Sequence, residues 1–402
     1  MTMVPRYVTL GLDGETAYLR TDKRNQINKI DAAILDCDGV LIDIRDSYNR
    51  AISRSVAYII EALTGCGISG NLTSDDVIFQ FRKCGGFNND WDTVYGILMY
   101  VLCNLPERAI RAIRKRIEET EWQTDPYLRL FSSKKTLETG RESEYLDDRL
   151  FETMMDGLKE FAEHLDVTGV ESVDRNLRRK PGVSRYPNFY DTLKNFLNKG
   201  GAGEGIIATV FEELFCGAGL FLKTHGMKPR FYEGPGTVEN GRAIISSDTL
   251  DQLSAAFGKA NFGIASGSKI EPARHILKGI LKRFRPESLV FLDDVEKAER
   301  EQSNNGSLKG SLRKPNPFSL FRAVKAFSSF KSVIYVGDSM EDVMMAKEAA
   351  KTDRRFLSGG AYHHSQPRDE IIQAFLDLEC DLILPSVNEL PLVLKRVGRD
   401  GN

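Results

Sequence analysis

The sequence predicts an α/β fold, in which a doubly wound parallel sheet is interrupted by a long helical insertion. Three observations predict it. Short apolar runs occur near the front and throughout the second half of the chain, and a small or acidic residue follows nearly every run. Runs this short and this uniformly apolar are typical of strands buried on both faces of a parallel sheet. Helical patterns separate these runs, and strand alternating with helix indicates a doubly wound, Rossmann-like domain.

The elements of this domain can be placed in order along the chain. A small hairpin is expected first, from Val8–Leu10 and Thr16–Leu19 around the turn signal Asp13-Gly14. The expected buried strands are Ala32–Leu35, Phe262–Ala265, Leu289–Leu292, Val333–Val336, Phe356–Leu357 and Leu382–Leu384. The expected helices between the later strands are Glu271–Arg283, Pro317–Phe327 and Glu341–Lys351.

The insertion runs from about residue 44 to residue 240 and lacks this alternation. Its helix candidates are Ser47–Leu63, Ser74–Arg82, Pro106–Trp122, Asp148–Leu165 and Glu204–Phe215. The Gly-, Pro- and Arg-containing stretch Asp166–Asn188 is expected to be a loop, as is Gln302–Ser311 in the second half. We therefore expect a discontinuous α/β domain at 1–43 and 241–402, with an all-helical domain at 44–240.

Composition excludes several classes of protein. With 41% hydrophobic and 28% charged residues, the chain is ordinary for a folded protein. A net charge of −2 gives no sign of a nucleic-acid partner. No apolar run approaches the roughly 20 residues that span a bilayer, and the charged N-terminus is unlike a signal peptide. The six cysteines are scattered without a Cys-x-x-Cys pair, so we expect no disulfide framework and a cytoplasmic location.

Polar residues follow the expected strands at their carboxyl ends, where open α/β sheets bind ligands. These residues are Asp36, Asp38, Ser266, Asp293, Asp294 and Asp338. Carboxylates gathered in one crevice repel each other unless a cation neutralises them. A few hard oxygen ligands that also face a phosphate describe a Mg²⁺ site better than a calcium cage. For Asp293 and Asp294, a helix-cap or turn role competes with metal binding.

Four short motifs, which follow one another along the chain in the family's order, resemble those of the haloacid dehalogenase (HAD) superfamily. Asp36-Cys37-Asp38-Gly39-Val40 is similar to its first motif, and Ile264-Ala265-Ser266-Gly267 to its second. Lys314-Pro315 and Gly337-Asp338-Ser339-Met340-Glu341-Asp342 are similar to the third and fourth. The resemblance covers about Asp31–Asp43 and Asn261–Ser386. The insertion lies where the subfamily with a helical, type I cap carries that cap.

The resemblance implies a phosphatase, a phosphoric monoester hydrolase. Asp36 would attack phosphorus and form an aspartyl-phosphate, which water then hydrolyses. Asp38 would protonate the leaving group and later deprotonate that water. Ser266 would hydrogen-bond a phosphoryl oxygen, and Lys314 would neutralise the charge on Asp36 and on the transferring group.

The same resemblance implies the ligands of the metal and of the substrate. Mg²⁺ would be held by Asp36, the backbone carbonyl of Asp38, and Asp338, with Asp342 either as a further ligand or as a partner of the ligands. Gly39 and the amide of Gly267 would contact the phosphate. Two departures from the family pattern are Cys37, expected to be a small buried residue, and Ser-Gly at 266–267, where Ser-Asn or Thr-Asn is commoner.

The insertion contains one loop candidate for reading the substrate. Asn88, Asn89 and Trp91 lie in a glycine-rich stretch that would suit a polar ligand, and a turn with Trp91 buried in the core is the competing interpretation. The glycine-rich stretch at 199–205 lacks the Gly-Lys-Ser/Thr of a P-loop and is expected to be a flexible loop.

The expected substrate is a small phosphorylated metabolite, whose identity the sequence does not specify. A phosphotransferase or phosphomutase acting on a sugar phosphate would use the same residues. A non-catalytic phosphate-binding sensor is a further alternative, but a decayed enzyme has usually lost Asp36 or Asp38, and both are present here. A large helical insertion can also mediate homodimerisation, and neither a nucleic acid nor a membrane is expected as a partner.

Overall fold

The contacts within the chain define two compact units. In the computed structural model, unit 1 comprises Met1–Arg45 and Gly241–Asn402, and unit 2 comprises Asp46–Asn240. The first boundary falls two residues after the one expected at 43. The structure describes residues 6–12, 14–67, 73–87, 89–120, 123–135, 148–180, 183, 186–197, 200–258, 261–365 and 367–399.

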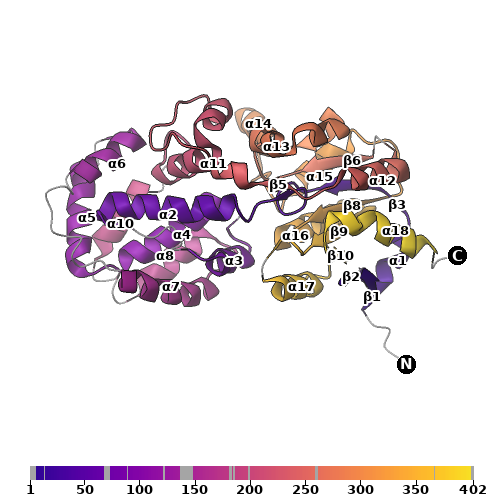
Figure 1. Cartoon of the computed structure of the whole chain (residues 1–402), viewed down its shortest axis with the longest axis horizontal. Coiled ribbons are helices and arrows are strands. Elements are labelled where there is room, and N and C mark those ends of the chain that lie inside the picture. Colours follow the sequence, from indigo (N-terminus) through magenta and orange to yellow (C-terminus); the bar gives the residue numbers. More distant parts are fainter. Residues whose placement is uncertain are drawn as a thin grey trace. The chain divides into compact units, whose positions relative to one another are not determined.

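Unit 1 is built on an eight-stranded, mostly parallel sheet in the order β1-β2-β10-β9-β8-β3-β6-β7. The strands are β1 (Tyr7–Leu12), β2 (Glu15–Arg20), β3 (Ile30–Leu35), β6 (Phe262–Ala265), β7 (Leu289–Val290), β8 (Ser332–Gly337), β9 (Phe356–Ala361) and β10 (Leu382–Leu384). The six strands from β10 to β7 pair in parallel, and the β1–β2 hairpin adds an antiparallel edge. Strand β3 comes from the N-terminal part of the sequence, yet it lies between β8 and β6, which come from the C-terminal half (Figure 1).

The helices of unit 1 cover both faces of this sheet. Its helices are α1 (Arg24–Ile27), α12 (Ser247–Phe257), α13 (Ile270–Leu277), α14 (Leu292–Asn304), α15 (Phe318–Val324), α16 (Met340–Thr352), α17 (Arg368–Asp377) and α18 (Leu390–Arg399). Ala33 and Leu35 of β3 belong to a core that includes residues of α12, α13 and α18. Ala32 and Ile34 belong to a second core with residues of α15 and α16. Because successive strand residues point to opposite faces, helices pack on both faces of the sheet, which confirms the predicted α/β class and is compatible with a Rossmann-like fold.

A two-stranded ribbon marks the point where the chain leaves unit 1 and returns to it. Strand β4 (Ile42–Asp43) pairs antiparallel with β5 (Arg242–Ala243). The amide of Ile244 also donates to the carbonyl of Leu41 at 2.8 Å. The segment that carries the first acidic motif is therefore tied to the segment that leads into the rest of the sheet.

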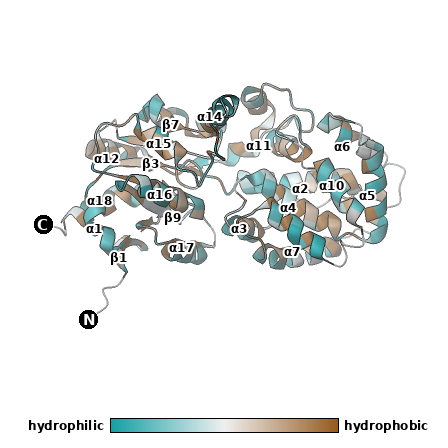
Figure 2. Ribbon diagram, turned by 180° about the vertical axis from the view of Figure 1, so that it is seen from behind, coloured by the Kyte–Doolittle hydropathy of each residue, from teal (hydrophilic) through white to brown (hydrophobic). Residues whose placement is uncertain are grey.

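The described part of unit 2 is mainly helical, with one isolated β-bridge between Gly217 and Pro235. Its helices are α2 (Tyr48–Thr64), α3 (Asp75–Lys83), α4 (Asp90–Cys103), α5 (Glu107–Thr120), α6 (Pro126–Lys135), α7 (Asp148–Glu163), α8 (Val170–Arg179), α10 (Pro187–Leu197) and α11 (Ile206–His225). Amphipathic α5 buries Ala109, Ile110, Ile113 and Ile117, and Figure 2 shows hydrophilic and hydrophobic residues alternating along it. These four buried residues form the packing face of α5.

Four helices of the insertion, α4, α6, α8 and α10, were not predicted. Residues 166–188 were expected to form a loop, but α8 and the start of α10 lie there. Arginine is a good helix former, and Val173 and Leu177, one turn apart, supply a buried stripe. Helix α4 was missed because it is buried almost all round, from Thr93 to Cys103, so its sequence lacks an amphipathic period.

None of the helices in the described part of the chain combines the length and the hydropathy of a bilayer-spanning segment.

Candidate active site

Asp36 lies at the carboxyl end of the central strand β3. Leu35, the last residue of β3, pairs with Ile264 of β6 on one side and with Val336 of β8 on the other. The amide of Asp36 donates to the carbonyl of Val336 at 2.8 Å, which continues the ladder by one residue. Because neighbouring parallel strands end at the same edge, the residues that follow β6 and β8 are directed to the surroundings of Asp36.

Carboxylates from two of these strand ends meet in one cluster. Oxygen atoms of Asp36, Asp338 and Asp342 all lie within 4.8 Å of one another. Asp338 follows β8, and Asp342 lies in the first turn of α16. Asp36 is 5% exposed and Asp342 is 1% exposed, so two negative charges are held almost out of water. Such a cluster requires compensating positive charge.

Lys314 supplies part of that charge. Its Nζ lies 3.0 Å from Oδ2 of Asp36 and donates to Oδ1 of Asp342 at 2.6 Å. Burial by itself would lower the pKa of this ammonium group, but the charges of Asp342 and Asp36 outweigh burial and raise the pKa well above its ordinary value. Lys314 is therefore a permanent cation between two buried carboxylates.

Asp36 remains under-compensated despite Lys314. Burial raises the pKa of its carboxyl group well above the ordinary value; Lys314 opposes this shift, whereas Asp342, Asp38 and Asp338 add to it. Its Oδ1 is buried and has no hydrogen-bond partner among the described residues. A divalent cation among these carboxylates would favour the ionised form of Asp36, and the surrounding donors are hard oxygens. The residues present therefore fit Mg²⁺.

Both oxygens of Asp342 are already engaged by the protein. Oδ1 accepts from Lys314 and lies 2.8 Å from the hydroxyl of Tyr335. Oδ2 accepts from the amide of Ser339 at 3.1 Å and from its hydroxyl at 2.6 Å. Burial would raise the pKa of Asp342, but Lys314 and these hydrogen bonds lower it. Asp342 is therefore better placed to position Lys314 than to bind a metal ion directly.

The loop after Asp36 turns sharply, so that its backbone faces Asp338. The amides of Leu41 and Ile42 both donate to the carbonyl of Cys37 at 2.8 Å, and the Cys37 side chain is buried, as expected. Gly39 has φ 71°, and a Cβ at this position would overlap the carboxylate of Asp338. Gly39 was predicted to contact substrate; in the structure its lack of a side chain gives Asp338 the room to approach the loop.

Asp38 is held by a residue that the sequence analysis missed. The hydroxyl of Ser268 donates to Oδ2 of Asp38, and the amide of Ser268 donates to the hydroxyl of Ser266 at 3.2 Å. Ser266 is buried directly after β6, while no described atom lies within 4 Å of a Cβ built on Gly267. Ser268 comes directly after the Ser-Gly motif, two residues after Ser266, and that spacing was the only signal available.

Asp293 and Asp294 act at helix starts. Oδ2 of Asp293 accepts from the amide of Ile270, at the start of α13, at 2.9 Å. Oδ2 of Asp294 accepts from the amide of Phe291, just before α14, at 3.1 Å, and its Oδ1 accepts from Arg322 at 2.9 Å. Of the two interpretations left open by the sequence, the structure shows the helix-cap role for both residues.

The predicted substrate-reading residues belong to unit 2. Asn88 lies outside the described residues. The side chain of Asn89 caps α4 by accepting from the amide of Trp91 at 3.0 Å. The indole of Trp91 donates to Oε1 of Glu212 at 3.2 Å, within the same unit. These two side chains therefore have structural partners inside unit 2.

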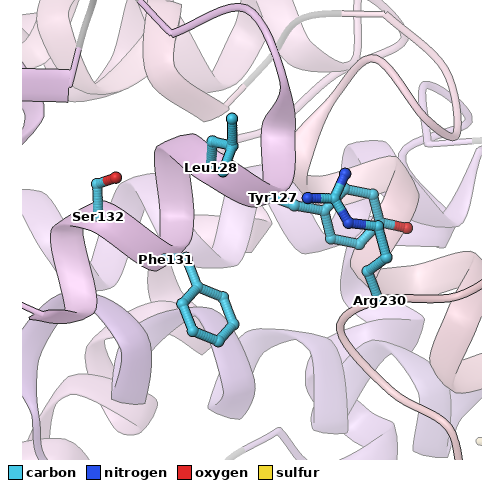
Figure 3. A pocket seen from close by; sticks show the side chains of 5 residues that line it. All are labelled: Tyr127, Leu128, Phe131, Ser132 and Arg230. Carbon is cyan, nitrogen blue, oxygen red and sulfur yellow. The ribbon is translucent and has the colours of Figure 1, made fainter.

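Unit 2 also contains a hollow lined by Tyr127, Leu128, Phe131, Ser132 and Arg230. Figure 3 shows the guanidinium group of Arg230 lying across the ring of Tyr127, at 4.0 Å from the ring centroid. Phe131 is 52% exposed. The lining includes the hydroxyl groups of Tyr127 and Ser132, but it has no carboxylate, imidazole or thiol that could activate them. The cluster around Asp36 is the stronger candidate.

We expect Gly39→Ala to lower the free energy of unfolding by more than about 1 kcal/mol, because alanine is strained at positive φ and its Cβ would displace Asp338. Urea unfolding of the purified protein measures this change. Gly267→Ala is the matched control and should stay within about 0.5 kcal/mol of the parent. Equal stability of the two variants would contradict the packing role of Gly39.

We expect Asp294→Ala to cost about 1 kcal/mol of stability, the usual value of a lost helix cap. Glu301→Ala, at an exposed position of the same helix, should be nearly neutral. Thermal unfolding of the two variants side by side tests this difference, and a neutral Asp294→Ala would argue against the capping role.

Comparison with known proteins supports the fold. No protein-family model matches the chain, and a search of curated proteins finds no match. A crystal structure described as a target of the Northeast Structural Genomics Consortium superposes with a TM-score of 0.58. It is 18% identical, and the match covers 92% of this chain and 99% of that one. At this identity the similarity concerns the fold alone, and it agrees with an α/β protein built on a mostly parallel sheet.

Proposed function

We propose that the protein is a magnesium-dependent phosphomonoester hydrolase of the HAD superfamily, which works through an aspartyl-phosphate on Asp36. One observation carries the proposal: a buried aspartate directly follows the central strand, with Lys314 beside one of its oxygens and two further carboxylates within 4.8 Å. Unit 2 corresponds in sequence position to the helical, type I cap of that superfamily. We further propose a small phosphorylated metabolite as the substrate.

The two oxygens of Asp36 differ in a way that suits a nucleophile. Oδ2 is held by Lys314, whereas Oδ1 has no partner among the described residues. An anchored carboxylate with one available oxygen is preorganised for in-line attack. In the first step, Oδ1 forms a bond to phosphorus while the bond between phosphorus and the ester oxygen breaks. The electron pair of that bond leaves with the ester oxygen.

Asp38 would carry the proton in both steps. In its protonated form it donates to the departing ester oxygen, which leaves as an alcohol. The resulting carboxylate then takes a proton from water as that water attacks phosphorus, which releases inorganic phosphate and regenerates Asp36. The hydrogen bond from Ser268 orients the Asp38 carboxyl group for this transfer.

The remaining groups would balance charge. Asp36, Asp338 and the backbone carbonyl of Asp38 would hold Mg²⁺, which when bound screens the repulsion between the carboxylates and the phosphate. Lys314 neutralises Asp36 and the transferring phosphoryl group, and Asp342 keeps the Lys314 ammonium in place. Ser266 would donate a hydrogen bond to a phosphoryl oxygen.

We expect Asp36→Asn to reduce the hydrolysis of p-nitrophenyl phosphate in the presence of Mg²⁺ by at least about 1,000-fold, because the nucleophile is lost. Asp38→Asn should reduce it by about 100- to 10,000-fold, the usual contribution of a general acid–base group. Far-UV circular dichroism provides the folding control. Substantial turnover by a folded Asp36→Asn variant would refute the covalent route.

We expect Asp338→Asn and Asp342→Asn to lose activity in different ways. Asp338→Asn removes a ligand, so the Mg²⁺ concentration that gives half-maximal activity should rise at least about tenfold. Asp342→Asn loosens Lys314, so kcat should fall while the Mg²⁺ requirement changes little. Titrating Mg²⁺ into chelator-treated protein measures both quantities. An equal rise in the Mg²⁺ requirement of both variants would make Asp342 a direct ligand.

A further inference from the structure

A second group of metal-type donors lies in unit 2, within α11. Atoms of Glu212, Cys216 and His225 all lie within 4.8 Å of one another. Nε2 of His225 is 3.0 Å from Oε2 of Glu212, and Sγ of Cys216 is 3.7 Å from the same oxygen. Cys216 is 3% exposed, and the side chains of His225 and Glu212 are 8% and 12% exposed. A thiol, an imidazole and a carboxylate therefore converge in a nearly dry place.

The spacing of these atoms suits a tetrahedral ion. A zinc ion bound at about 2.3 Å to sulfur and about 2.0 Å to nitrogen and oxygen separates sulfur from oxygen by roughly 3.5 Å, and nitrogen from oxygen by roughly 3.3 Å. The observed separations of 3.7 Å and 3.0 Å differ from these values by only a few tenths of an ångström. Small side-chain movements would therefore be enough for Oε2 of Glu212 to share an ion with Sγ of Cys216 or with Nε2 of His225.

A break in α11 is what brings the third donor to the other two. Glu212 and Cys216 are one helical turn apart and share a face. In a straight helix, His225 would lie about 20 Å along the axis from Glu212. Gly217, with φ 68° and ψ 170°, interrupts the helix and returns the chain towards its first half. A Cβ at Gly217 would overlap Gly236, so the break depends on glycine.

The surroundings orient the donors as they do around bound metals. The indole of Trp91 donates to Oε1 of Glu212 at 3.2 Å and leaves Oε2 directed at Cys216 and His225. The ring of Phe221 lies 4.8 Å from that of His225, measured between centroids, and covers it. A metal-binding carboxylate is commonly held in this way by a hydrogen bond to its second oxygen.

The geometry points to a site for a zinc-class divalent ion, bound by Oε2 of Glu212, Sγ of Cys216 and Nε2 of His225, with the fourth position left to water or another ligand. The thiolate and the imidazole select zinc or cobalt over magnesium, which prefers oxygen ligands alone. The ion would link the two halves of the broken helix. This site is independent of the proposed hydrolysis at Asp36.

Cobalt provides a direct test, because cobalt bound to a thiolate gives a charge-transfer absorption band. The full-length protein is stripped of metal, kept reduced with a phosphine, and titrated with Co²⁺ in excess Mg²⁺, which occupies all-oxygen sites. We expect one equivalent of Co²⁺ to produce the band and one equivalent of Zn²⁺ to abolish it. A protein that shows no thiolate band would overturn the proposal.

Variants locate the site. Cys216→Ser should remove the band, and His225→Gln should weaken Co²⁺ affinity at least about tenfold. Cys66→Ser, a buried cysteine elsewhere in the unit, and Asp36→Asn should both retain the band. A band that persists in folded Cys216→Ser would contradict the assignment. If Cys216→Ser does not fold, the wild-type titration and His225→Gln decide the question.

Trp91→Phe separates orientation from direct binding. Loss of the indole donor should weaken Co²⁺ affinity about tenfold while the thiolate band keeps its shape. Unchanged affinity in Trp91→Phe would show that its hydrogen bond to Glu212 does not support the site.

Discussion

The contact on which unit 1 depends is the one between the Lys314 ammonium group and the carboxylates of Asp36 and Asp342. Without it, a doubly wound sheet would end in a buried cluster of like charges, which is strongly unfavourable in a low-dielectric interior. Lys314 offsets part of this repulsion and leaves Oδ1 of Asp36 without a partner among the described residues. The same contact therefore keeps the cluster tolerable and leaves an available oxygen beside a position suited to a cation.

The topology of the sheet explains why these groups meet. Strand β3 lies between β8 and β6, so a residue that follows β3 has the end of one neighbouring strand on each side. The chain leaves unit 1 just after the first acidic motif, and the β4–β5 ribbon joins the point where it leaves to the point where it returns. Almost two hundred residues can therefore be inserted without separating β3 from the strands that supply Ser266 and Asp338.

One glycine in each unit allows a close approach that a side chain would block. Gly39 allows the Asp338 carboxylate to approach the loop after β3, and Gly217 allows α11 to turn back on itself. In each case a positive φ and the absence of a Cβ let polar groups approach that a regular helix or an ordinary turn would keep apart. Close approach of backbone to a polar group is thus a shared condition for the cluster at Asp36 and for the cluster at Glu212.

Sequence by itself determined the α/β class, the strands that carry Asp36, Ser266 and Asp338, and the position of the insertion, because short apolar runs and their polar ends are local patterns. Only the tertiary structure decided that Ser268 holds Asp38, that both oxygens of Asp342 are occupied, and that Asp293 and Asp294 cap helices. It also showed that 170–179 is helical and that His225 returns to Glu212. The contacts from Ser268 to Asp38 and from Ile270 to Asp293 join residues far apart in sequence, so they depend on the packing of whole elements and no local pattern of residue types records them.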